Sequence, residues 1–137
     1  MVSSLMEAAL RSLLIGHAPL TALVPAARIV WNHLPQDTPN PAIVLYRISG
    51  GPGIHMQGSD RLTNATVQID VRAETVASMW AVRDALVALL HGYRGVQGTV
   101  SFRGIFLIGD RQDSDKPGTV LLHRSSTDWD VWSGLTA

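Results

Sequence analysis

The sequence of 137 residues contains no cysteine. This absence excludes a disulfide scaffold, zinc sites built on thiolates and catalysis by a cysteine nucleophile. Charge is scarce too: charged residues make up 16% of the chain, against roughly 25% in an average soluble domain. The 11 basic and 11 acidic side chains cancel, which is unlike a dedicated nucleic-acid binder with clustered lysine and arginine. A weakly charged surface repels copies of itself little, which favours a protein that works inside an assembly over a small neutral monomer.

Long apolar runs are also missing. No run approaches the ~18 residues that a membrane-spanning helix requires, and the first residues do not resemble a signal peptide. We therefore expect the protein to be made and kept in the cytoplasm of its host cell. The length predicts a single domain over residues 1–137, because a chain of this size buries roughly two-thirds of its unfolded surface.

Two segments have the apolar spacing of helices. Residues 4–15 begin with the capping-box sequence SLME, in which Ser4 is the expected N-cap. Residues 75–91 begin at Thr75, a second expected N-cap, and carry one apolar stripe. The stripe consists of Val76, Met79, Val82, Leu86, Leu89 and Leu90. Residues 17–25 can form at most a short helical turn, since proline lies near both ends.

Five segments rich in β-branched and aromatic residues predict strands. They cover residues 28–33, 42–49, 61–72, 99–113 and 120–132. The second and third are expected to pair, with Val67, Ile69 and Val71 facing inward and Asp70 on the outward side. Gly104 is expected to break or bulge the fourth strand. The order of elements predicts an α+β fold: one mainly antiparallel sheet of about five strands covered by two helices.

The chain carries no recognisable catalytic or ligand motif. Glycines at residues 50–53 follow a strand, but no helix starts after them to hold a phosphate on its N–H groups. The five histidines lack the spacing of metal ligands. Asp110, Asp113 and Asp115 lie near a predicted turn at residues 113–118 without an EF-hand pattern, which indicates solvated carboxylates. We therefore predict no catalytic residue, no cofactor and no metal ligand.

Two regions are candidate contacts for a partner. Residues 50–60 form a glycine-rich segment whose Ile54 and Met56 would gain from burial against a partner. In the last strand, Trp129 and Trp132 point to opposite faces, so either helices cover both faces or one tryptophan is available for a partner. A plain hairpin connector and ordinary packing at the sheet end are the alternatives. The candidate interaction residues are Gly53, Ile54, His55, Met56, Gln57 and Trp132.

Nearly the whole chain resembles one family of virion proteins. The resembling stretches are EAALRSLL (7–14), PAIVLYR (41–47), VQIDVRAET (67–75), LLHGYRG (89–95) and RSSTDWDVW (124–132). In this order they are similar to the tail-completion proteins of long-tailed bacteriophages, also called tail-terminator or head-to-tail joining proteins, and to their relatives in gene transfer agents. These stretches are fold-pattern residues and contain no chemical motif.

The resemblance implies a structural protein without catalytic residues, located at the head–tail junction of a phage or phage-like particle. It implies a homo-oligomer, a hexameric ring, that caps the finished tail tube and stops its growth. The implied partners are the tail tube protein and a head-side connector or stopper protein; DNA passes through the ring without specific binding, and no membrane is involved. Another neck component, an adaptor or stopper, is the alternative of the same class. A small enzyme and an isolated ligand-binding α+β domain also stay open, because catalytic triads are defined by geometry.

Overall fold

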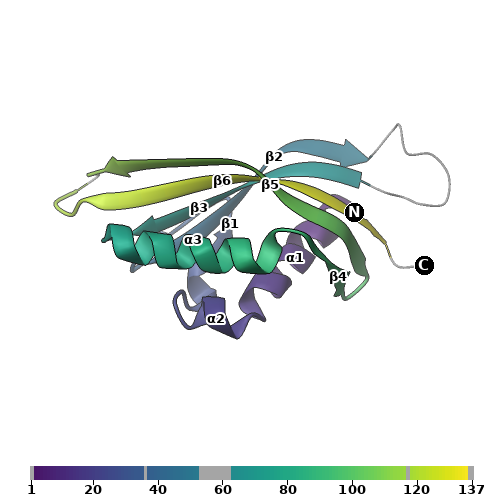
Figure 1. Cartoon of the computed structure of the whole chain (residues 1–137), viewed down its shortest axis with the longest axis horizontal. Helices are drawn as coiled ribbons and strands as arrows, with labels where there is room; N and C mark the ends of the chain where they lie inside the picture. The colour runs from purple at the N-terminus through teal and green to yellow at the C-terminus, as the bar shows by residue number, and fades with distance from the viewer. Residues whose placement is uncertain (1, 36, 53–62, 117, 136–137) are drawn as a thin grey trace.

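The computed structural model describes residues 2–35, 37–52, 63–116 and 118–135 (Figure 1). In chain order the elements are α1 (Val2–Ile15), α2 (Ala18–Thr21), the 3-10 helix η1 (Ala26–Arg28), β1 (Ile29–Trp31), β2 (Ala42–Pro52), β3 (Thr63–Ala73), α3 (Val76–Leu90), β4 (Tyr93–Gln97), β5 (Val100–Asp115) and β6 (Leu122–Leu135). The helices all lie on one side of a twisted sheet (Figure 1). The α+β class is therefore confirmed, and α1 and α3 are the two predicted helices. No helix in the described part of the chain is long and apolar enough to cross a membrane.

Six strands form the sheet, in the order β1-β2-β3-β6-β5-β4. Neighbouring strands are antiparallel except β1 and β2, which run parallel, so the sheet is mixed. The sequence predicts about five strands, and the strand it misses is β4. Gly92, with φ of 78°, reverses the chain after α3, and Gly98, with φ of 62°, forms the turn into β5. The segment between them, YRGVQ, is short and has a glycine at its centre, which weakens any strand pattern.

The register of the long strands is interrupted at single residues. One extra residue, Ile48, bulges from β2 against β3, and another, Ile108, bulges from β5 against β6. A further irregularity beside Gly104 confirms the predicted break in that strand. A bulge residue has no partner opposite it, so the two-residue alternation of faces is lost at these positions.

The apolar stripe of α3 forms much of the core. Its buried members are Met79, Val82, Leu86 and Leu90, and Val76 and Leu89 pack partly buried against the same core. Thr75 is the N-cap as predicted, and its hydroxyl accepts the N–H of Ser78 at 3.1 Å. The corresponding prediction for α1 is wrong. That helix already begins at Val2, so Ser4 has helical backbone and lies inside the helix, whereas an N-cap requires extended backbone.

The pairing of β2 with β3 and the inward side of β3 are confirmed. Val67, Ile69 and Val71 are fully buried beneath the sheet. Asp70 lies on the opposite side, as predicted, but it is only 2% exposed. Its Oδ1 accepts hydrogen bonds from Ser126 Oγ at 2.7 Å and from Gln68 Nε2 at 2.9 Å. A side chain on the face without helices is thus not necessarily in solvent.

Side-chain bonds to backbone carbonyls attach α1 to the edge of the sheet. The indole of Trp31 donates to the carbonyl of Glu7 at 2.9 Å. Arg11 donates to the carbonyls of Ile29 at 2.7 Å and Ala26 at 3.1 Å. These bonds hold the N-terminal helix against η1 and β1.

Candidate interaction surfaces

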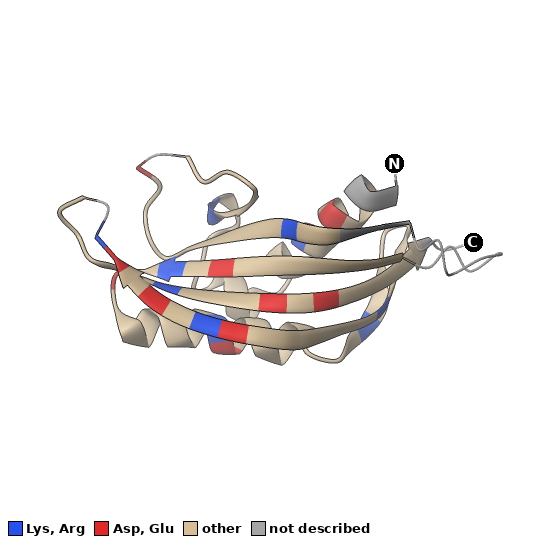
Figure 2. Ribbon diagram, turned by 90° about the horizontal axis from the view of Figure 1, so that it is seen from above, with Lys and Arg blue, Asp and Glu red and all other residues tan. Residues whose placement is uncertain are grey.

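The face of the sheet without helices carries charge in neighbouring strands (Figure 2). Arg111 of β5 and Asp128 of β6 form an ion pair at 2.6 Å, and Arg124 of β6 pairs with Asp113 of β5 at 2.7 Å. The aspartates of β5 were predicted to be turn carboxylates, and this is wrong for Asp113. The strand continues because β6 pairs with it as far as Asp115. The result is a polar face on which opposite charges alternate.

Hydrogen bonds within these pairs shift the pKa values of Asp113, Arg124 and Arg111 in the direction that favours the charged form. The hydrogen bond from Arg124 lowers the pKa of Asp113 below its ordinary value of 3.8. The same bond raises the pKa of Arg124, and the bond to Asp128 raises the pKa of Arg111. The face therefore carries compensated rather than absent charge.

Of the predicted interaction residues, the structure places Trp132 on this polar face. Its indole is partly buried and donates to Oδ2 of Asp130, on the same strand, at 3.0 Å. Oδ1 of Asp130 accepts a second bond, from Asn64 of β3. Trp129, by contrast, is fully buried on the helix side, so the two tryptophans do occupy opposite faces as predicted. Gly53, Ile54, His55, Met56 and Gln57 lie outside the described residues, and their interaction role stays a prediction.

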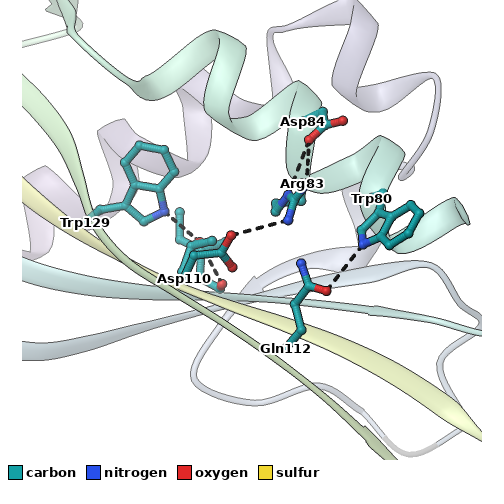
Figure 3. Close-up of polar contacts among 8 residues, drawn as sticks. Trp80, Arg83, Asp84, Asp110, Gln112 and Trp129 are labelled. Atoms are coloured by element: carbon teal, nitrogen blue, oxygen red, sulfur yellow. Dashed lines mark hydrogen bonds and ion pairs between the residues drawn. The ribbon is translucent and has the colours of Figure 1, made fainter. Parts of the chain in front are cut away.

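A second surface, missed by the sequence analysis, lies where α3 runs along β5 (Figure 3). Trp80 Nε1 donates to Oε1 of Gln112 at 3.3 Å. Arg83 bridges Asp84 of its own helix, at 3.1 Å, and Asp110 of β5, at 3.3 Å. We call this surface, with the outer edge of β5, the α3–β5 flank. It also corrects the expectation of a solvated turn carboxylate at Asp110, which is paired.

Exposed apolar side chains mark both sides of the domain. On the α3–β5 flank, Trp80 is 48% and Ile108 59% exposed. Across the sheet, Ile48 of β2 is 56% exposed. The only sequence signal for these residues was that Trp80 stands off the apolar stripe of its helix. The two isoleucines belong to segments that were predicted only to be strands, without a prediction of which side chains are exposed.

The hollows formed by the described residues include two that are partly open at the surface. One, of about 370 Å³, lies between Ala8 of α1 and the turn at Gly98, and is open to solvent. The other, of about 230 Å³, is lined by Arg72, Arg124, Asp115 and Leu122. Within the same described residues, no three His, Asp or Glu side chains are close enough together to hold a metal ion.

Comparison with known proteins identifies the family. The sequence profile of the family described as "Tail completion protein gp17" matches residues 8–132. The chain belongs to the tail completion protein family. The expected family resemblance is thus confirmed, and this is a structural protein of phage-type particles rather than a member of an enzyme family. A comparison with curated proteins gives no match.

Solved structures agree with this family at the level of the fold. A chain from the structure described as "Virion of native gene transfer agent (GTA) particle" is 16% identical, with a TM-score of 0.68 over 93% of this tail completion protein and 92% of that chain. A second solved structure is 18% identical, with a TM-score of 0.59 over 100% of this chain and 97% of that one. At these identities the likeness establishes a shared fold.

Proposed function

We propose that this protein is a ring-forming subunit at the head–tail junction, which caps the tail tube and joins it to the head connector. The observation that carries the proposal is the pair of unlike flanks on one sheet. Trp80 and Ile108 are exposed on the α3–β5 flank, and Ile48 is exposed on the other side. A subunit of a closed ring needs two different contact patches on opposite sides, because each copy meets its two neighbours head to tail.

The dimensions suit a ring around DNA. A compact chain of this length has a radius of gyration of roughly 14 Å and a diameter of about 37 Å. Six touching spheres leave a central hole as wide as one sphere, which admits duplex DNA even after side chains narrow it. Two arginines of the polar sheet face, Arg111 and Arg124, are paired with aspartates, so they would hold passing phosphates weakly. We therefore propose that DNA passes without specific binding.

The proposal is tested on particles from a producing bacterial host, where the protein would be made in the cytoplasm before assembly. Averaged electron micrographs of particles carrying a labelled chain are compared with particles from a deletion strain. We expect a ring of label between the tail tube and the head connector, and tails that are unjoined or of uncontrolled length without the protein. Label elsewhere in the neck would favour an adaptor or stopper role, and label absent from the junction would overturn the proposal.

A further inference from the structure

At each edge of the sheet, the outermost strand is shorter than the strand beside it. Part of that longer strand, β2 at one edge and β5 at the other, therefore has no neighbour on its outer side. β1 pairs only with residues 43–45 of β2, and β4 pairs only with residues 100–105 of β5. In the described part of the chain, no strand lies on the outer side of residues 46–52 or of residues 108–115. We call these segments the free β2 edge and the free β5 edge. Such edges present unpaired N–H and C=O groups that can accept another strand.

The free β5 edge begins after the last residues of β5 whose outer backbone groups form hydrogen bonds within the described domain. Nδ1 of His91, just after α3, accepts the N–H of Leu107 at 3.1 Å, and the N–H of Gly92 reaches the carbonyl of Ile105 at 2.7 Å. Beyond Leu107, α3 contacts β5 through side chains: Trp80 donates to the side chain of Gln112, and Arg83 pairs with the side chain of Asp110. The backbone of this segment is therefore open to a partner strand.

The two free edges lie at opposite ends of the molecule. The β5–β6 hairpin extends past the helices at one end of the long axis, and β2 and β3 end at the other (Figure 1). β2, β3, β6 and β5 alternate in direction, so β2 and β5 run antiparallel. A second copy displaced along the long axis can therefore place its free β2 edge antiparallel to the free β5 edge of the first.

We propose that the free β5 edge of one copy pairs with the free β2 edge of the next, joining the sheets of neighbouring copies head to tail. The inference rests on the proposed ring and names the contact that builds it. Both edges run for about 20 to 25 Å at the ordinary rise of a strand, so they match in length. Each copy uses one free edge to contact one neighbour and the other free edge to contact the second neighbour. Head-to-tail contacts of this kind form a closed ring when the rotation between neighbouring copies adds up to a full turn.

Charge favours a second copy as the occupant of each edge. On the free β5 edge, Asp110 and Asp113 are paired with Arg83 and Arg124, and Arg111 is paired with Asp128. Asp115, which forms no ion pair with a described residue, therefore gives this edge its negative charge. The described part of the free β2 edge contains Arg47, which forms no ion pair with any described residue. The acidic edge of one copy thus meets the basic edge of the next, whereas two β5 edges would repel each other.

Apolar side chains stand at both edges as well. The bulge residues Ile48 and Ile108 are each more than half exposed, and Trp80 lies beside the free β5 edge. A strand added to β5 would remove Ile108 and Trp80 from solvent. A tryptophan beside a desolvated strand is the kind of anchor that dominates protein interfaces.

Cysteine cross-linking in assembled particles tests the pairing of the two edges. The natural chain has no cysteine, so copies of it form no disulfides with one another unless cysteines are introduced. Ser49→Cys on the free β2 edge is combined with one cysteine at each position from 108 to 115 in turn. Directly opposite residues of paired strands lie close enough for a disulfide. Since side chains alternate between faces, the yield of cross-linked oligomers should rise and fall with a period of two residues. Ser49→Cys with Ala88→Cys, on the exposed face of α3, is the control.

Lysine substitutions test the same contact without cross-linking. Lysine on an edge strand opposes strand addition, and both isoleucines are exposed enough to accept it without loss of fold. We expect Ile48→Lys and Ile108→Lys each to abolish the ring while leaving the melting temperature unchanged. Val96→Lys is the matched control, because Val96 lies on edge strand β4 and is also 56% exposed. It should assemble normally.

The outcomes separate this inference from the proposed function. A two-residue period in cross-linking, with assembly lost only in the two isoleucine variants, supports edge pairing. A ring at the junction that shows no such period, or that tolerates both isoleucine variants, overturns edge pairing and leaves the proposed function standing. Particles without the chain at the junction would overturn the proposed function itself.

Discussion

Two hydroxyl groups on the same strand should respond oppositely to removal. Ser125 and Thr127 both lie on the helix side of β6, and both are 0% exposed. Thr127 Oγ1 donates to the carbonyl of Ile69 at 3.1 Å and accepts the indole N–H of Trp129 at 2.8 Å. Ser125 Oγ is buried and has no hydrogen-bond partner in the described structure. The two buried hydroxyl groups differ in hydrogen bonding, so comparing them tests that effect.

The expected magnitudes follow from these contacts. Thr127→Val keeps the shape of the side chain but leaves the buried N–H of Trp129 without an acceptor, which should cost about 1 to 3 kcal/mol. Ser125→Ala removes a buried hydroxyl that already lacks a partner, and should stabilise the fold by about 1 kcal/mol. For a domain of this size, 1 kcal/mol corresponds to a shift in melting temperature of roughly 3 to 5 °C.

Urea titration of both variants, followed by tryptophan fluorescence, measures the difference. The midpoint should fall for Thr127→Val and rise for Ser125→Ala, with the slope of the transition unchanged in both, because the surface exposed on unfolding is the same. Thr127→Ser is the control, since it retains the hydroxyl that accepts from Trp129. If Ser125→Ala lowered the free energy of unfolding by 1 kcal/mol or more, as in a typical destabilising mutant, the hydroxyl would have a partner and the reasoning would be wrong.

Three further predictions follow from the core and the surface. Leu86→Ala should cost about 2 to 5 kcal/mol by calorimetry, because Leu86 is fully buried in the α3 stripe; a loss below half a kcal/mol would show that the stripe is not core. Arg124→Gln should raise the pKa of Asp113 toward 3.8 in an NMR titration, because the ion pair lowers it. Because the folded-state pKa of Asp113 is lowered, the ion pair stabilises the fold above pH 3.8 and this stabilisation is lost as the pH falls through the lowered pKa. The difference in stability between the natural protein and Arg124→Gln should therefore be smaller at pH 2 than at pH 7. Trp80→Ala should change stability by less than about 1 kcal/mol while reducing joined particles, and Trp132→Ala should reduce both stability and joining; normal joining in either variant would remove that tryptophan from the contact.

Much of the fold could be predicted because its signals are local. The stripe from Val76 to Leu90 and the cap at Thr75 lie within one helix, and the structure confirms both. The apolar alternation in β3 likewise identifies its buried side. In each case the residues that determine the element are neighbours in the sequence, and no distant contact overrides them.

The errors concern positions that depend on distant parts of the chain. The length of β5 depends on pairing with β6 as far as Asp115, beyond the polar residues that suggested a turn. β4 is a strand because it adds to the edge of β5, since its own composition hardly favours one. Asp70 is buried because Ser126 and Gln68 donate to it. None of these partners can be identified from local spacing.

The candidate contacts show the same limit more sharply. Trp132 was selected because the last strand alternates, and alternation did place it on the face without helices, where Asp130 binds its indole. Ile48 and Ile108 were assigned to strands from the composition of their segments, and both are exposed at bulges. A bulge arises from the mismatch between two paired strands, so neither strand alone reveals it. The positions where local rules fail are therefore the ones that leave apolar side chains beside open strand edges, and those edges are where a second copy would bind.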